Sequence, residues 1–183
     1  MLNISIRTET AEDVAAIDAV TIAAFLHAPH TDHTEQFIVK ALRAVGELTV
    51  SLVAECDGAV VGHVAVSPVT ISNAASNGSA GNSTDFNSAT GWFGLGPISV
   101  LPDYQGNGIG SRLMREALHR LKAAGAAGCV LLGDPAYYHR FGFRAEPDLV
   151  LPGVPAEYFQ ALSLGGELPR GVVTYSTAFE AKE

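Results

Sequence analysis

The chain has 183 residues, of which 48% are hydrophobic and 16% charged, and its formal net charge is -8. This length suits one folded domain, and the apolar content is well above that of a disordered chain. The acidic balance, without any long run of Lys or Arg, argues against a nucleic-acid-binding or an anionic-membrane-binding surface.

The segments that would direct a chain to or across a membrane are missing from the sequence. No apolar stretch reaches the roughly 18 residues of a membrane span, and residues 1–7 lack a basic region followed by an apolar core. Cys56 and Cys129 lie in apolar, strand-like segments, as buried reduced cysteines usually do. We therefore expect a cytoplasmic protein with no membrane partner and with two structural cysteines.

The pattern of apolar residues in the first part of the chain predicts two helices and three strands. Apolar and polar residues alternate over 2–7, which predicts a strand. The capping-box pattern of Thr10 and Asp13 comes next, and the apolar residues after it recur at helical spacing, which predicts the first helix. The further elements expected here are a helix over 34–45 that ends at Gly46 and a hairpin of strands 48–54 and 59–71 that turns at Asp57 and Gly58. These two strands form an antiparallel pair.

A polar insert separates this part from a strand-helix-strand unit. Residues 73–91 are almost wholly Asn, Ser, Gly, Ala and Thr, too poor in apolar surface to offset their ordering entropy, so we expect a flexible insert. A strand over 92–100, a helix over 108–123 and a strand over 129–132 predict a βαβ crossover with two parallel strands. Helices are expected near 136–141 and 157–162 and a last strand over 171–179, which gives one α/β domain, 1–183, with a mixed, mostly antiparallel sheet.

The turn between strand 92–100 and the following helix carries the most specific chemical signal. It contains Gly106, Gly108 and Gly110, which allow the backbone to approach an anion closely. The free N–H groups of the helix's first turn and the positive end of its dipole would then bind a pyrophosphate. Because the dipole contributes only about 0.3 to 1 kcal/mol, several charge-assisted N–H bonds must supply most of the affinity.

Two other phosphate-binding motifs fit this turn poorly. A P-loop requires Lys before Ser or Thr, whereas Gly110 is followed directly by Ser111. A dinucleotide fingerprint requires G-x-G-x-x-G in an early βαβ unit, but these glycines are spaced by two and lie far from the N-terminus. A plain strand-to-helix connector remains the non-functional alternative.

The turn resembles a known signature. Gln105-x-x-Gly108-x-Gly110 after an apolar strand is similar to the acyl-CoA motif of the GNAT superfamily of N-acetyltransferases. About thirty residues later, Tyr137-Tyr138 followed by Phe141-Gly142-Phe143 resembles the superfamily's second signature. Together with Gly133-Asp134-Pro135, this segment looks most similar to the predicted acetyltransferases of the YhbS-like group.

The resemblance implies how the acyl donor binds. In a GNAT-like fold the two central parallel strands splay apart, and the pantetheine arm of acetyl-CoA lies in the gap with its amides on the backbone of Ile98 and Val100. A backbone N–H there would face the thioester oxygen, where one such donor is worth about 2.7 to 4 kcal/mol of barrier. The resemblance implies acetyl-CoA as acyl-donor substrate, no metal, and these binding residues: Ile98, Ser99, Val100, Gln105, Gly106, Asn107, Gly108, Ile109, Gly110 and Ser111.

The resemblance also implies direct attack by an amine, with Tyr138 protonating the departing thiolate, so that neither cysteine need be a nucleophile. An amine like that of lysine is almost fully protonated at pH 7, so some group must take its proton. The candidates are Glu55, His63, Asp134 and the three histidines of one loop, which are His27, His30 and His33. None stands out, because a mid-strand His is more often structural, Asp134 is as well suited to cap a helix, and the loop histidines are too irregularly spaced to favour a zinc site.

Two functions remain open from the sequence. The first is an active N-acetyltransferase that acts in a ternary complex on a small-molecule or peptide amine. The second is a CoA-binding regulatory or inactive module that holds acetyl-CoA without turnover. The loops carry no readable code for the amine, and a homodimer stays open.

Overall fold

The computed structural model describes residues 2–29, 31–72 and 88–182. The chain forms two compact units, of which the first comprises 1–67, 95–124 and 176–183 and the second 68–94 and 125–175. Strands β3 (Ala59–Ser72) and β5 (Trp92–Val100) each contribute residues to both units. The expectation of a single domain over 1–183 stays a prediction.

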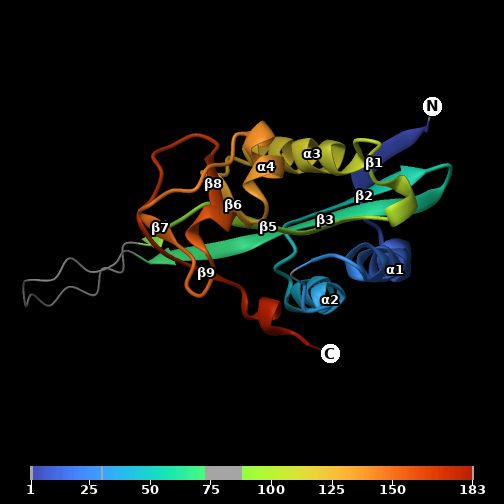
Figure 1. Cartoon of the computed structure of the whole chain (residues 1–183), viewed down its shortest axis with the longest axis horizontal. Coiled ribbons are helices and arrows are strands. Elements are labelled where there is room, and N and C mark those ends of the chain that lie inside the picture. Colours follow the sequence, from blue (N-terminus) through green and yellow to red (C-terminus); the bar gives the residue numbers. More distant parts are fainter. Residues whose placement is uncertain (1, 30, 73–87, 183) are drawn as a thin grey trace, which may run out of the picture. The chain divides into compact units, whose positions relative to one another are not determined.

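The first unit combines a small sheet with three helices (Figure 1). Its sheet contains β1 and β2, which are antiparallel neighbours, together with parts of β3 and β5. Its elements are β1 (Ile4–Thr8), η1 (Ala11–Asp13), α1 (Val14–Phe25), α2 (Glu35–Val45), β2 (Val50–Cys56), η2 (Pro102–Tyr104), α3 (Ile109–Ala123) and η5 (Thr177–Glu180).

Helices cover both faces of this small sheet, with α1 and α2 on one face and α3 on the other (Figure 1). On the α1 and α2 side, Ile17 and Val39 pack against Val53 and Ala65 of the two central strands. On the opposite side, four apolar residues of α3 that recur at helical spacing are fully buried: Leu113, Met114, Ala117 and Leu121. The apolar periodicity read from the sequence is therefore the contact surface of each helix.

Local signals set the ends of these elements. Thr10 N–H donates to Asp13 Oδ2 at 2.7 Å, which places the predicted capping interaction just before α1. Gly46 ends α2 in the left-handed conformation, with φ of 75°. Asp57 and Gly58 turn the β2–β3 hairpin, and both have positive φ, 49° and 84°.

The second unit is built around strand β6 (Gly128–Leu132). This strand pairs parallel with β5 and antiparallel with β8 (Phe159–Ser163). The remaining elements of the unit are β4 (Ser88–Ala89), α4 (Pro135–Tyr138), η3 (His139–Phe141), β7 (Leu149–Val150), η4 (Ala156–Tyr158) and β9 (Gly171–Tyr175). Its core gathers side chains from β3, β5, β6, β7, β8 and β9, among them Ile71, Trp92 and Val173.

The parallel pairing confirms the predicted βαβ crossover. It covers three residue pairs, from Trp92 opposite Gly128 to Gly94 opposite Val130. Because most other strand pairs are antiparallel, the mixed, mostly antiparallel sheet is also confirmed. None of the described helices is both long and apolar enough to cross a membrane.

Three expectations change. The helix expected over 157–162 is wrong, because residues 157–158 end η4 and residues 159–162 belong to β8, whose buried residues complete the sheet beside β6. The strand expected over 171–179 ends at Tyr175 and is followed by η5. The flexible insert 73–91 was drawn too wide at its end, since β4 pairs with β3; residues 73–87 lie outside the described part of the chain.

Candidate active site

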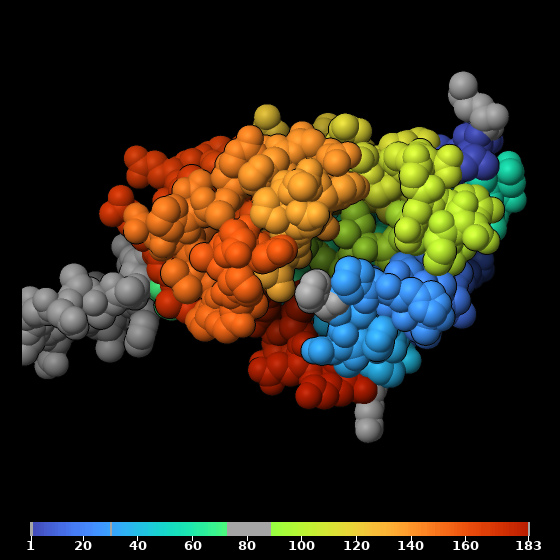
Figure 2. All heavy atoms as spheres, in the orientation of Figure 1, coloured from blue at the N-terminus to red at the C-terminus, as the bar shows by residue number. Residues whose placement is uncertain are grey.

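The glycine turn belongs to the first unit and connects η2, which follows β5, to α3. Gly106 and Gly108 both have φ of 76°, a left-handed conformation that side chains with a Cβ rarely adopt. Residues 105–108 are exposed, and the yellow-green atoms of this part of the chain lie at the molecular surface (Figure 2). The glycine spacing is therefore required by the backbone path of the turn.

Helix α3 begins with its N–H groups available. The first N–H with an acceptor in the same helix turn is that of Arg112, which donates to Gly108 O at 3.1 Å. The N–H groups of Ile109, Gly110 and Ser111 precede it, and helix geometry gives them no acceptor within the helix. Together with the positive end of the helix dipole, these donors can bind an anionic group that approaches over the glycines.

Two side chains predicted as cofactor contacts form hydrogen bonds within the turn itself. Gln105 Nε2 donates to Val100 O at 3.0 Å and so fastens the turn to the end of β5. Asn107 Nδ2 donates to the carbonyl oxygens of Tyr104 and Gln105 at 3.1 and 3.2 Å. These bonds fix the backbone before a ligand arrives, which lowers the ordering cost of binding.

The three residues of β5 in the candidate site differ in what they expose. The Ser99 side chain is buried, and its Oγ lies 3.3 Å from Thr21 Oγ1 of α1. Ile98 and Val100 are half-buried. Since Ser99 is engaged with α1, this segment can offer a ligand its backbone groups and the flanking side chains, but not the Ser99 hydroxyl.

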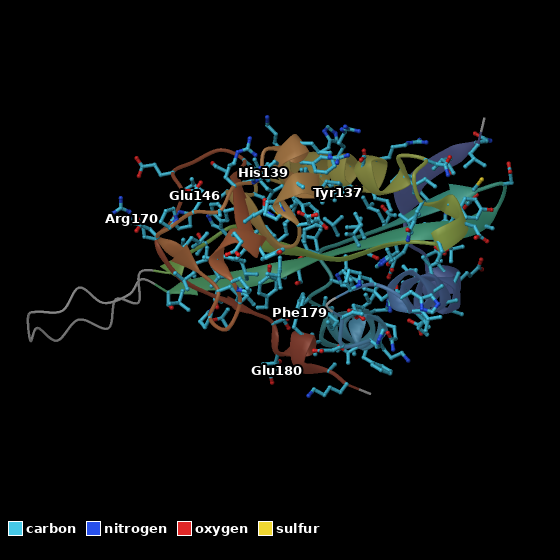
Figure 3. All side chains as sticks on the ribbon, in the orientation of Figure 1. Tyr137, His139, Glu146, Arg170, Phe179 and Glu180 are labelled. Carbon is cyan, nitrogen blue, oxygen red and sulfur yellow. The ribbon has the colours of Figure 1, made fainter. Side chains whose placement is uncertain are left out.

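Tyr138 lies in the second unit, at the end of α4. Its ring makes edge-on contacts with Tyr137, at 4.9 Å between centroids, and with Phe143, at 6.3 Å. The neighbouring Tyr137 carries the Arg140 guanidinium 4.6 Å from its ring centroid, and Figure 3 labels Tyr137 and His139 on this segment. The aromatic contacts hold the Tyr138 ring, while its hydroxyl has no hydrogen-bond partner in the described part of the chain.

Burial raises the pKa of Tyr138 to about 12, with smaller contributions from Tyr137 and Asp134. The phenol is therefore protonated throughout the neutral pH range. As a proton donor it is weaker than an exposed tyrosine, whose pKa is about 10. This side chain can donate a hydrogen bond to a developing anion at any pH between about 6 and 10.

Two of the carboxylates considered as general bases have structural partners. Asp134 caps α4, because its Oδ1 accepts from Ala136 N–H at 2.9 Å. Glu55 accepts from Arg7 Nε at 2.8 Å. For Asp134 the helix-capping interpretation of the sequence is thus confirmed.

The histidines divide into exposed and buried ones. His27 and His33 are exposed residues between α1 and α2, and His30 lies outside the described residues. His63 is fully buried in β3. Within residues 2–29, 31–72 and 88–182, no group of three or more His, Cys, Asp or Glu residues has the arrangement of a metal site. Cys56 and Cys129 are both buried, and no disulfide joins them.

His63 belongs to a partly buried polar cluster in the first unit. Arg43 donates to both carboxylate oxygens of Glu9 at 3.0 and 2.9 Å, and Ser51 Oγ donates to Glu9 Oε2. Ser51 Oγ also lies 2.8 Å from His63 Nε2. Although burial acts in the other direction, the hydrogen bonds from Arg43 and Ser51 hold the pKa of Glu9 below its usual value.

These bonds determine the tautomer of His63. The single hydroxyl proton of Ser51 is used on the carboxylate, so Nε2 of His63 must donate to Ser51 Oγ. Its Nδ1 then carries the lone pair, and it has no partner in the described residues. Burial and the Arg43 charge lower the pKa of His63 to about 4 in spite of Glu9, which makes it a neutral core histidine.

Comparison with known proteins identifies the family. The model of the acetyltransferase (GNAT) domain matches residues 47–145, which include both the glycine turn and Tyr138. This chain belongs to the GNAT family of acetyltransferases. The resemblance of the two sequence motifs to this family is thereby confirmed.

Similar proteins cover nearly the whole GNAT chain. The N-acetyltransferase YhbS of Escherichia coli K12, named as uncharacterized, is 38% identical over 161 residues, which are 85% of this chain and 87% of the relative. A GNAT family acetyltransferase from Brucella melitensis, solved in complex with acetyl-CoA, superimposes with a TM-score of 0.79 and 47% identity over 97% of this chain and 98% of the other. Escherichia coli YhbS in complex with CoA superimposes with a TM-score of 0.82 and 34% identity over 98% and 93% of the two chains.

Some residues that shape the site could not be recognised in the sequence. No sequence motif marks Thr21 of α1, whose Oγ1 lies 3.3 Å from Ser99 Oγ. Gln160 was placed in a predicted helix, but it lies buried in β8 and binds Gly133. The sequence signal for Gln160 is that it is the polar residue in the otherwise apolar run from Phe159 to Leu162.

The low pKa of His63 predicts a measurable loss of stability in acid. An unfolded chain takes up this proton near pH 6.5 and the native protein only near pH 4, so the stability present above pH 6.5 is lost as the pH falls toward 4. Between pH 7.5 and 5 this contribution amounts to about 2 kcal/mol of unfolding free energy. Urea unfolding at the two pH values should show that His63→Gln loses about 2 kcal/mol less than the wild type.

His119 of α3 provides the matched control, because it is exposed. His119→Gln should keep the wild-type pH dependence. An equal pH dependence in His63→Gln and the wild type would show that His63 is not buried in its neutral form.

Proposed function

We propose that this GNAT protein binds acetyl-CoA with its pyrophosphate on the backbone N–H groups of residues 106–111 and transfers the acetyl group to an amine. The observation that carries the proposal is the start of α3. The left-handed Gly106 and Gly108 lie in the exposed segment 105–108, directly before the N–H donors of the first turn of α3, Ile109 to Ser111. Similar proteins with 47% and 34% identity were solved with acetyl-CoA and with CoA, which supports the same ligand here.

A pyrophosphate fits this turn better than an uncharged ligand does. Each charge-assisted N–H bond is stronger than a bond between neutral groups, and several donors converge on one anion. The glycines add close approach, since no Cβ stands between the ligand and the backbone. The remaining contacts would come from backbone groups of Ile98 and Val100, which bind the amides of the pantetheine arm.

The chemistry is direct transfer in a ternary complex. The amine nitrogen attacks the thioester carbonyl carbon, and the carbonyl oxygen becomes an oxyanion that a β5 backbone N–H stabilises. The C–S bond then breaks with its electron pair on sulfur, and the nitrogen loses its extra proton to solvent. The products are the N-acetylated amine and CoA. The acceptor is a small-molecule or peptide amine, and the protein works in the cytoplasm, where thiols such as Cys56 stay reduced.

Tyr138 would assist the departure of the thiolate. With a pKa of about 12, full proton transfer from Tyr138 to a separated thiolate of pKa about 8.5 would be uphill by roughly 5 kcal/mol, that is 3.5 pKa units at 1.36 kcal/mol each. We therefore infer that the hydroxyl donates a hydrogen bond to the sulfur as the charge develops and passes its proton in the course of bond cleavage. The phenolate then takes a proton from water.

The first prediction from this proposal concerns Gly108. Gly108→Val should abolish acetyl-CoA binding, because the added side chain covers the N–H groups of the helix start, and isothermal titration calorimetry measures the affinity. The matched control is Gly46→Val, since Gly46 has nearly the same φ of 75° and equally open space around its Cβ position. Both variants carry the same backbone strain, so only Gly108→Val should lose binding. Unchanged affinity in Gly108→Val would reject the assignment of the turn.

The second prediction concerns the Tyr138 hydroxyl. Tyr138→Phe keeps the ring and removes the proton donor, so kcat should fall about a hundredfold or more while acetyl-CoA affinity and Tm stay nearly unchanged. Tyr137→Phe, a change of the same size in the adjacent ring, should keep kcat within about twofold of the wild type. Pre-steady-state thiol release separates the chemical step from product release. A near wild-type chemical rate in Tyr138→Phe would reject the acid role.

A further inference from the structure

Gly133 joins β6 to α4, and strand β8 and the segment before it hold its backbone from two directions. Its N–H donates to Tyr158 O at 2.9 Å. Its carbonyl oxygen accepts from Gln160 Nε2, also at 2.9 Å. Both polar groups of this residue are therefore fixed, although it lies in a connection between two elements.

The reason for a glycine at this position is space. Gly133 does not have positive φ, so the backbone conformation alone would accept another residue. A Cβ added here would overlap the ring of Tyr138, whose Cε2, Cδ2 and Cζ atoms are its nearest neighbours. The Tyr138 ring thus packs directly on the Gly133 backbone.

Helix α4 brings the ring back to this glycine. The Asp134 side chain caps the helix, and Tyr138 N–H donates to Asp134 O at 3.1 Å, which closes one turn. The ring of Tyr138 consequently lies against the backbone of Gly133. Any shift of the Gly133 peptide would be passed to the Tyr138 ring, because the two are in contact.

Gln160 is an unusual residue for its position. It is fully buried in β8, between Phe159 and Ala161 of the second unit's core. A buried amide costs stability unless it is fully hydrogen-bonded, and its Oε1 has no partner in the described residues. An apolar residue of the same size would avoid this cost, so the presence of the amide needs another explanation, and its hydrogen bond to Gly133 provides one.

We propose that Gln160 and Gly133 form a clasp that positions the Tyr138 hydroxyl for its role in catalysis. Gln160 holds the Gly133 carbonyl, and the bare Gly133 backbone provides the surface on which the ring rests. Both are positioning residues, since neither needs to touch substrate. This inference rests on the proposed acid role of Tyr138 and adds two residues to it.

The test is a pair of double-mutant cycles. Gly133→Ala moves the ring, and Gln160→Met removes the amide but keeps an apolar side chain of similar length; each is made in the wild type and in Tyr138→Phe. A misplacement of about 1 Å can cost up to a hundredfold, so each change should lower kcat by about tenfold or more in the wild type. In Tyr138→Phe the same changes should lower kcat less than about twofold, because the hydroxyl they position is already gone.

Two glycine controls separate positioning from general damage. Gly165→Ala adds the same methyl group where no atom lies within 4 Å, and it should leave kcat unchanged. Gly128→Ala forces a Cβ against the ring of Trp92, so it should lower Tm while changing kcat equally in both backgrounds. If Gly133→Ala does not fold, Gln160→Met carries the test alone.

The outcomes distinguish the two proposals. A fall in kcat that is equal in the wild-type and Tyr138→Phe backgrounds, or the absence of any fall, would overturn the clasp while the acid role stands. A wild-type chemical rate in Tyr138→Phe itself would reject the acid role and the clasp with it. As a second readout, ultraviolet titration of Tyr138 in Gln160→Met should show its pKa shifted down from about 12, because a displaced ring regains water.

Discussion

The start of helix α3 is the constraint on which the candidate site depends. Gly106 and Gly108 both take up the left-handed conformation, and the chain passes from β5 into the helix within a few residues. A helix that begins in this way leaves the N–H donors of its first turn without intrahelical acceptors. Gln105 and Asn107 donate hydrogen bonds to neighbouring carbonyl oxygens, which stabilise the shape of the turn without a ligand. Binding of an anion then requires little reorganisation of the protein.

In the second unit, aromatic rings pack directly against the backbone of glycine residues. Gly94, Gly128 and Gly133 each leave space for an aromatic ring, from Tyr175, Trp92 and Tyr138 respectively. The first two rings belong to the core of the unit or pack against it. The third, Tyr138, is half-buried and has a raised pKa. The contact between an aromatic ring and a glycine thus stabilises the core at Gly94 and Gly128 and, by our proposal, contributes to catalysis at Gly133.

Much of the fold could be predicted because it rests on local patterns. Helix α3 follows from its apolar spacing, the β2–β3 hairpin from Asp57 and Gly58, and the parallel crossover from the order of strand, turn, helix and strand. Strand β8 was mistaken for a helix because a short apolar run looks alike in either state, and the pairing that decides for the strand, with β6, is distant in sequence.

The candidate site was partly visible for the same reason. The glycine turn and the Tyr138 segment are each continuous in the sequence, so their motifs could be read directly. The cluster of Glu9, Arg43, Ser51 and His63 draws on four separate segments, and no local pattern predicts it. Gln160 and Gly133 are likewise 27 residues apart. Contacts of this kind depend on the completed fold, which sequence periodicity does not describe.

The central claim is that this protein turns over acetyl-CoA by direct transfer to an amine. Release of free CoA thiol, measured with a panel of small-molecule amines and peptides at a fixed acetyl-CoA concentration, tests it most directly. We expect at least one amine to give thiol release that saturates with amine concentration, with the acetylated amine formed in equal amount. Acetyl-CoA binding without amine-dependent thiol release across the panel would contradict the claim and would favour a module that binds CoA without turnover.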